Sequence, residues 1–112
     1  MFGTCDAIEG ILKEAEELMK EAKTDTVRDA AMVGAAQAVE HYEIFRYGTL
    51  MAWASKLGMD DAADLLGETL AEEKATDKAL SELAESEINV EADDLPEKHE
   101  GAMTAKKRAA SK

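Results

Sequence analysis

The sequence predicts an all-α fold, in which two long helices form an antiparallel hairpin and a shorter helix precedes them. Three observations predict this. Ala, Glu, Lys, Leu and Met dominate the composition, whereas β-branched residues are sparse. Apolar residues recur at steps of three and four along most of the chain. The one proline, Pro96, lies near the C-terminal end, so no proline interrupts the helical segments that precede it.

The first helix is predicted within residues 2–22, where the apolar positions follow a helical repeat. These positions are Cys5, Ile8, Leu12, Ala15, Leu18, Met19 and Ala22. Thr4 or Asp6 can cap the start of this helix. The sequence KTDT then breaks it, and Thr24 or Asp25 can cap the next helix.

The second helix is predicted from about Thr26 to Leu57, which gives a length of roughly 48 Å at 1.5 Å per residue. Gly58 marks its end, because glycine commonly occupies the position that follows a helix. Asp60 or Asp61 then starts the third helix. A turn this short makes the second and third helices antiparallel neighbours.

The chain divides into a helical domain, residues 1–90, and a charged tail, residues 91–112. From about Asn89 the apolar periodicity is lost, and an acidic block is followed by a basic end. Such a composition cannot bury enough apolar surface to order itself, so the tail is predicted to be disordered. The helical domain is therefore the part of the chain in which a functional site is expected.

The composition excludes several classes of function. The 112 residues carry a formal net charge of −12, which argues against nucleic acid as a partner, because phosphate backbones bind basic surfaces. The single cysteine, Cys5, permits no intrachain disulfide and fits a reducing cytoplasm. We expect a cytoplasmic protein without a signal peptide or a membrane span.

Acidic residues lie within the apolar sides of both long helices when each is projected at about 100° per residue. On the second helix, Glu40 and Glu43 fall in the sector that also holds Val33, Ile44, Tyr47 and Met51. On the third helix, Glu73 and Asp77 are enclosed by Leu66, Leu70, Leu80 and Ala84. Charged groups are costly to bury without partners, so this placement requires an explanation.

The four acids are also predicted to lie at matching depths in the hairpin. Glu43 and Glu73 are each about 15 residues from the turn, and Glu40 and Asp77 are each about 18 residues from it, so equal rise per residue brings them level in pairs. Their carboxylates should then raise each other's pKa unless a positive charge compensates them. The apolar sectors contain no Lys or Arg at that height.

A bound cation would supply the missing charge, and we predict a metal site formed by Glu40, Glu43, Glu73 and Asp77. Carboxylates with imidazole suit manganese or iron, and all-oxygen sites also suit magnesium or calcium. The alternative is that these side chains lie at the rim of a helix interface and extend outward into water.

The same stretches resemble the YciF-like stress-protein family, a ferritin-like group. The specific parts are the AAQ-x-VEHYEI-x-x-YGT segment of the second helix and the L-x-EEK-x-x-D segment of the third, and the resemblance covers about residues 4–90. It implies a di-metal carboxylate bundle, in which two helices carry Glu donors and two carry Glu-x-x-His motifs. Glu40 and Glu43 would belong to the third bundle helix, and Glu73 and Asp77 to the fourth.

The sequence departs from that pattern in two respects. Thr76, not histidine, stands three residues after Glu73, so no Glu-x-x-His motif is present. Family members usually carry two further long helices before the segment that begins near Cys5. The present chain therefore corresponds to half of a bundle. We expect it to form a homodimer or higher homo-oligomer that completes a four-helix bundle, the alternative being a shortened copy that binds a full-length relative.

Three classes of function remain open. The first is a ferritin-like protein that binds iron or manganese in a di-metal centre and acts in stress, as the resemblance implies. The second is a metal-free helical interaction or structural protein, for which the small residues Gly34, Ala35, Ala38 and Ala52 allow close helix packing. The third is an oxidase or peroxidase with a di-iron centre near Tyr47. The sequence contains no arrangement of nucleophile and base and no phosphate-binding loop.

Overall fold

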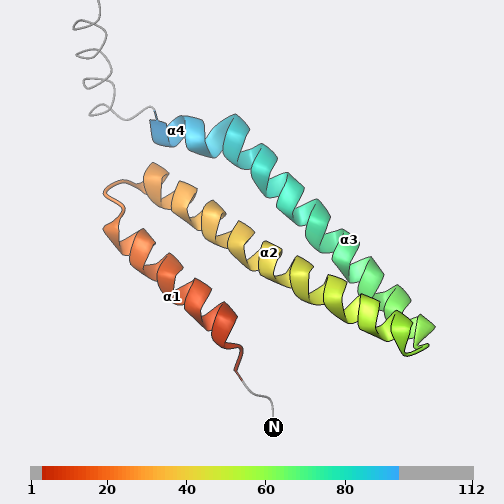
Figure 1. Cartoon of the computed structure of the whole chain (residues 1–112). Helices are drawn as coiled ribbons and strands as arrows, with labels where there is room; N and C mark the ends of the chain where they lie inside the picture. The colour runs from red at the N-terminus through yellow and green to blue at the C-terminus, as the bar shows by residue number, and fades with distance from the viewer. Residues whose placement is uncertain (1–3, 94–112) are drawn as a thin grey trace, which may run out of the picture.

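The structure, a computed structural model, describes residues 4–93 and consists of helices throughout that range (Figure 1). α1 spans Asp6–Glu21, α2 spans Asp25–Lys56 and α3 spans Asp60–Leu83. A short π-helical stretch, η1 (Ala84–Ile88), joins α3 to a final turn, α4 (Asn89–Asp93). The predicted all-α fold with a short first helix and a long hairpin is confirmed.

The local signals for the helix ends act largely as predicted. The side chain of Thr24 caps α2 by accepting a hydrogen bond from the Val27 backbone N–H at 3.3 Å. Gly58 has a φ of 75°, a left-handed conformation that glycine adopts without steric cost, and this reverses the chain between α2 and α3. Cys5 rather than Thr4 or Asp6 occupies the N-cap position of α1 and makes no side-chain cap.

The helical run extends past the predicted boundary at residue 90, since α4 ends at Asp93 and contacts α2. The loss of apolar periodicity near Asn89 coincides with η1, a π turn that changes the repeat without ending the helix. The rest of the predicted tail, residues 94–112, lies outside the described residues.

The helices pack in a single layer with α2 between α1 and α3 (Figure 1). Gly67 of α3 permits a close approach, because a Cβ atom there would lie 3.2 Å from the sulfur of Met51. Where α1 turns into α2, Arg28 Nε donates a hydrogen bond to the Met19 carbonyl oxygen at 3.2 Å. A layer of this kind leaves both of its flat sides without a covering element among the described residues.

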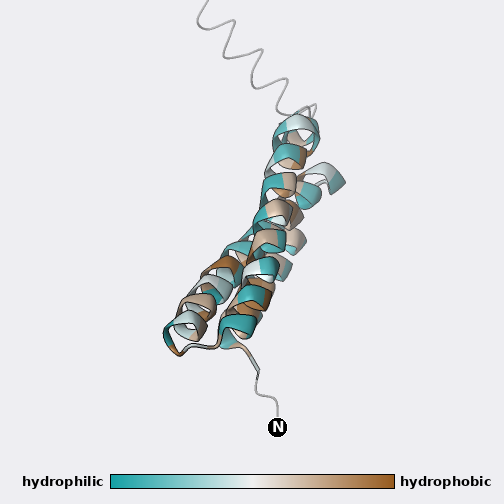
Figure 2. Cartoon of the chain, turned by 90° about the vertical axis from the view of Figure 1, so that its right-hand side faces the viewer, coloured by the Kyte–Doolittle hydropathy of each residue, from teal (hydrophilic) through white to brown (hydrophobic). Residues whose placement is uncertain are grey.

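The interior of this layer is built from small side chains. The buried apolar residues are Ala15, Ala54, Ala63 and Ala84, and no large side chain among residues 4–93 is fully buried. Figure 2 shows hydrophobic and hydrophilic segments interspersed along the helices. The exposed large apolar residues are Leu12, Leu18, Met32, Phe45, Leu50, Trp53, Leu57, Met59, Leu65, Leu83 and Val90. The larger apolar side chains of the described helices thus remain in contact with solvent, and the alanines form the interior.

No described helix combines the length and the apolar character that a bilayer span requires.

Candidate metal centre

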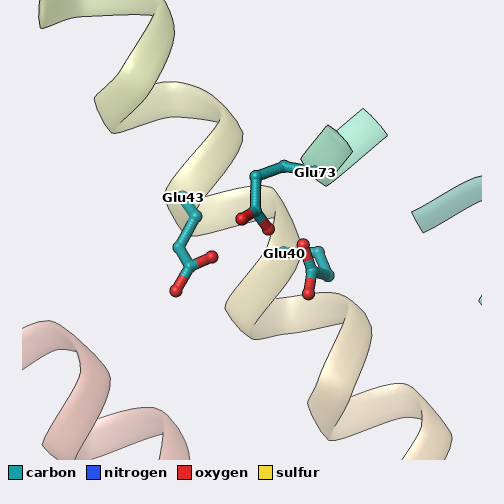
Figure 3. Close-up of side chains that lie close together, drawn as sticks. All are labelled: Glu40, Glu43 and Glu73. Atoms are coloured by element: carbon teal, nitrogen blue, oxygen red, sulfur yellow. The ribbon is translucent and has the colours of Figure 1, made fainter. Parts of the chain in front are cut away.

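Three glutamates converge halfway along the α2–α3 hairpin (Figure 3). Glu40 and Glu43 come from α2, almost one helical turn apart, and Glu73 reaches them from α3. One carboxylate oxygen from each residue lies within 4.8 Å of the others. The turn at Gly58 brings the two helices level at this point, as the equal distances from the turn predict. We call these three residues the carboxylate cluster.

The cluster lies in a half-buried environment that offers it little compensation. All three side chains have intermediate exposure, and the Oε2 atom of Glu40 is buried without a hydrogen-bond partner. The ion pairs that Asp25, Asp77 and Glu82 form involve none of the three cluster glutamates. A carboxylate oxygen that is buried without a partner is costly in free energy.

The proximity of these groups alters their titration. The pKa of Glu43 is raised above its usual 4.5 because its carboxyl group shares a hydrogen bond with Glu73, with further contributions from burial and from the Glu73 charge. The pKa of Glu73 is raised as well, mainly through its hydrogen bond with Glu40 and then through burial. Without a cation, these two carboxyl groups therefore take up protons at a higher pH than an ordinary glutamate does.

The fourth predicted ligand, Asp77, does not join the cluster. Its Oδ1 atom lies 3.0 Å from His41 Nε2 and accepts a hydrogen bond from Gln37 Nε2 at 3.5 Å. Gln37 also donates to Ser81 Oγ at 2.7 Å. These four residues, here called the polar clasp, line a depression of about 420 Å³ with Gly34 and Ala38. The structure thus brings together three of the four predicted site residues and gives Asp77 partners within the protein.

The helical projections of the sequence already place Asp77 on the same side as His41, but the metal-ligand hypothesis did not use this. On the two projections, Asp77 lies about 40° from Glu73 and His41 about 100° from Glu40, both on the same side of the line between the helices. Because α2 and α3 are antiparallel and level, these two displacements bring the side chains towards each other. The imidazole therefore belongs with Asp77 and not with the carboxylate cluster.

A further polar contact joins α1 to α2 away from the cluster. The exposed Cys5 thiol donates a hydrogen bond to the Tyr42 hydroxyl at 3.4 Å. The pKa of Cys5 is lowered and that of Tyr42 is raised mainly because the Tyr42 hydroxyl can donate a hydrogen bond to the Cys5 sulfur when the thiol is ionised. The contact positions the start of α1 on α2 and brings no additional ligand to the carboxylate cluster.

Comparison with known proteins agrees with the fold and with the resemblance of its motifs. Residues 3–93 match the family described as a domain of unknown function, DUF892. The chain is 52% identical over 89 residues to the protein YciF of Escherichia coli strain K12. The chain belongs to the DUF892 family of YciF-like proteins. The sequence-based identification of the YciF-like family is thereby confirmed.

Two solved structures are similar to the chain in both sequence and fold. The crystal structure of the E. coli stress protein YciF matches with a TM-score of 0.73 and 50% identity, covering 80% of this chain and 56% of the other. YcfI from Rhodopseudomonas palustris matches with a TM-score of 0.68 and 54% identity, covering 70% and 50%. The chain also spans only 54% of the length of the E. coli sequence that it matches.

Proposed function

We propose that this protein binds a metal ion, iron or manganese, through Glu40, Glu43 and Glu73, and that it acts in the stress response as a ferritin-like protein. The observation that carries the proposal is the convergence of three carboxylates from two helices around the buried, unpartnered Oε2 atom of Glu40. The stress setting is transferred from E. coli YciF, which is described as a stress protein.

The donor set fits a hard cation. Carboxylate oxygens are the preferred ligands of Mn²⁺, Mg²⁺ and Ca²⁺ and also bind iron, whereas copper and zinc favour imidazole or thiolate donors. The only histidine on the described helices, His41, is engaged by Asp77, and Cys5 is engaged by Tyr42. A redox-active ion held here would supply electron-transfer chemistry, and the three glutamates would hold and charge-balance it.

Equilibrium metal binding tests the proposal. Chelator-treated protein should bind Mn²⁺ and, under anaerobic conditions, Fe²⁺ in calorimetric titrations, with loss of affinity of at least tenfold in Glu73→Gln, because each ligand contributes on the order of 1.4 kcal/mol or more. Glu68→Gln is the matched control. Glu68 is an exposed acid on the same helix, and its replacement removes one negative charge, as Glu73→Gln does. Equal loss in both variants would reduce the effect to general electrostatics and contradict the site.

A second candidate function is that of a metal-free structural or interaction protein. The observation that favours it is the closeness of the three carboxyl groups, which raises the pKa of Glu43 and of Glu73 and so allows protons to take the place of a cation. A structural role is also the one suggested for YcfI of R. palustris. The double variant Glu40→Ala with Glu73→Ala separates the two functions. A double variant that is more stable than wild type and assembles equally well supports the metal-free role.

A further inference from the structure

An apolar groove lies between α1 and α2, on the flat side of the layer that carries the polar clasp. It has a volume of about 260 Å³, and we call it the α1–α2 groove. Gly34 and Ala38 line both this groove and the depression of the polar clasp, so the two hollows adjoin. On α2, Glu43 projects about 160° away from His41. The groove is therefore separate from the carboxylate cluster and from the proposed metal site.

The α1–α2 groove has the dimensions of a helix-binding site. Its floor consists of small residues of α2, and its α1 wall carries two larger apolar side chains. These residues are Ala31, Gly34, Ala35 and Ala38 on the floor, and Ile11 and Leu18 on the wall. Residues 31–38 and residues 11–18 each extend for about 10 Å, or two helical turns. An amphipathic helix presents its anchors over this length, at positions i, i+3 or i+4, and i+7.

Gly34 leaves open space above the floor of the groove. A Cβ atom at Gly34 would meet no atom within 4 Å. Gly58, and not Gly34, has the positive φ that favours glycine. Glycine within a helix is destabilising relative to alanine, and nothing among the described residues requires it at position 34. The missing side chain does serve an external helix, because the distance between two helix axes depends on the size of the side chains at their contact.

The rim of the groove on α1 is acidic. Glu14 lines the groove itself, and an adjoining hollow holds Glu17 and Glu21 as well, against a single lysine, Lys13. The three glutamates are exposed. Glu14 and Glu21 project about 100° and 120° from the buried Ala15, on the side of the groove, and they lie two turns apart. The rim therefore offers negative charge at the spacing of residues i and i+7 of a bound helix.

The far edge of the same flat side is basic instead. Lys74 and Lys78 of α3 project about 100° and 140° from Glu73, on the side of Asp77. Lys78 forms an ion pair with Glu82 at 3.9 Å. The polar clasp lies between these lysines and the α1 rim. A helix bound to the groove is therefore oriented with its basic flank towards α1.

We propose that the α1–α2 groove binds an amphipathic α-helix of a partner protein, whose inner side carries apolar anchors and whose flank towards α1 carries Lys or Arg. Helical partners occupy apolar grooves in this way. Charge complementarity selects the occupant, because Glu14 and Glu21 attract a basic flank and repel the phosphates of a lipid surface or a nucleic acid. The groove lies on the side away from the carboxylate cluster, so the interaction does not depend on bound metal.

The test uses the full chain and labelled peptides of about 18 residues, a length that supports a helix in water. Three peptides carry Lys along one flank and differ in their apolar anchors, which are Ala, Leu or Met. For each, a matched peptide carries Glu in place of Lys. Fluorescence anisotropy should show a dissociation constant of roughly 0.1 mM or lower for at least one Lys peptide, and at least about tenfold weaker binding for its Glu counterpart. The constants should agree within about twofold with Mn²⁺ and with EDTA.

The floor of the groove is tested by filling it. Gly34→Leu places a side chain in the groove and should weaken binding of the Lys peptide at least about tenfold. Leu is the better helix former, so this variant should remain at least as stable as wild type in urea denaturation. Gly48→Leu is the matched control, because Gly48 is also a glycine of α2 whose Cβ position meets no atom within 4 Å, but it does not line the groove. This control should leave binding unchanged.

The charge of the rim is tested by paired variants of α1. Glu14→Gln with Glu21→Gln should weaken binding of the Lys peptide at least about threefold. Glu9→Gln with Glu16→Gln is the matched control, because it removes the same charge at the same spacing. Glu9 and Glu16 project about 120° and 100° from Ala15 on the side away from the groove. Screening by salt should keep the effect of the control pair below about twofold.

Binding that depends on Gly34 and on the Glu14–Glu21 rim, but not on the two controls, supports the inference. Equal binding of the Lys and Glu peptides overturns it, and so does equal weakening by the two charge pairs. The absence of binding by every Lys peptide at roughly 0.1 mM also overturns it.

Two other occupants of the groove would overturn the inference as well. The first is a second copy of the chain. It is indicated if the molar mass in sedimentation equilibrium is that of a dimer for wild type and that of one chain for Gly34→Leu. The second is the basic segment of this chain, residues 106–112. It is indicated if the combined variant Lys106→Glu, Lys107→Glu and Arg108→Glu binds the Lys peptide at least about tenfold more tightly than wild type does.

Discussion

The two sides of the α2–α3 hairpin treat their carboxylates in opposite ways. On one side Asp77 is paired with His41 and Gln37 within hydrogen-bonding distance. On the other side, only one helical turn away, Glu73 meets Glu40 and Glu43, and the Oε2 atom of Glu40 is buried without a partner. The polar clasp pairs its carboxylate within one chain, whereas the carboxylate cluster leaves one buried oxygen atom without a hydrogen-bond partner.

This difference separates residues that stabilise the hairpin in the single chain from the residues of the proposed metal site. Hydrogen bonds to a charged group contribute to stability when both partners are present, and a buried group without a partner is costly. The clasp should therefore affect stability without affecting metal binding. The cluster should destabilise the metal-free chain and stabilise the metal-bound one.

The largest expected effect is thermal stabilisation by metal. Mn²⁺ at about 100 times its dissociation constant should stabilise the folded chain by about 2.7 kcal/mol, because it binds the folded state alone. For a domain of this size that corresponds to a rise in Tm of about 10 °C or more, measured by circular dichroism. Glu43→Gln should abolish most of the rise, whereas Asp77→Asn should retain it. If Glu43→Gln keeps the rise in Tm on addition of Mn²⁺, the cluster does not differ from the polar clasp in metal binding.

The next largest effect should follow from Gly58→Ala. The φ of 75° at Gly58 is strained for any residue with a Cβ, so this change should lower the free energy of unfolding by about 1–2 kcal/mol. It should also weaken metal binding, because the turn sets the level at which α2 and α3 bring their acids together.

Gly10→Ala is the control for the turn variant in the same denaturation series. A Cβ at Gly10, within α1, meets no atom within 4 Å. The change should therefore stabilise the chain by about 0.5–1 kcal/mol and leave metal affinity unchanged. If Gly58→Ala and Gly10→Ala change the free energy of unfolding and the metal affinity equally, the left-handed turn at Gly58 does not determine either quantity.

A smaller effect is expected from Asp77→Ala, which removes the shared partner of His41 and Gln37. The free energy of unfolding should fall by about 1 kcal/mol, as measured by urea denaturation, since the His41 side chain is 67% exposed and water replaces part of the interaction. Metal affinity should change less than twofold. Asp64→Ala, an exposed acid on the same helix, is the control and should be neutral. A loss of metal binding in Asp77→Ala would place Asp77 in the site after all.

The smallest expected effect is the pH dependence of the metal-free chain. The pKa values of Glu43 and Glu73 are raised above the usual 4.5, so between that value and the raised pKa the folded state binds more protons than the unfolded state. Stability in EDTA should therefore be greatest below pH 4.5 as far as these groups contribute, and their contribution should be lost as the pH rises through the raised values. Glu73→Gln should flatten this slope, and Glu68→Gln should leave it intact.

Most of the fold could be predicted because the helix signals are local. The cap at Thr24 and the turn at Gly58 each depend on one residue type with a preferred conformation. The end of the last helix could not be predicted, because η1 shifts the apolar repeat at Ala84–Ile88 while the backbone hydrogen bonding continues to Asp93. The apolar repeat indicates which side chains are buried, and it indicates only indirectly where the backbone hydrogen bonding of a helix ends.

A helical projection predicts which residues lie on one side of the hairpin, but it does not predict which of their side chains touch. Glu40, Glu43 and Glu73 lie within about 60° of the hairpin line and meet across it. Asp77 lies at about 40° on the other side of that line, close enough to be predicted as a ligand but on the side of His41. Which of two near neighbours an acid contacts depends on side-chain rotamers and on the exact helix crossing, and the spacing of residues along a chain determines neither.

The all-alanine interior restricts how this protein can evolve. At Ala15, Ala54, Ala63 and Ala84, every replacement other than glycine adds volume where helices touch, and added volume in a packed interface forces the backbones apart. The spacing between α2 and α3 decides whether short carboxylate side chains can reach one ion. Selection on the site would then act on methyl groups that lie far from it, and these alanines should vary less among functional variants than the larger side chains on the surface.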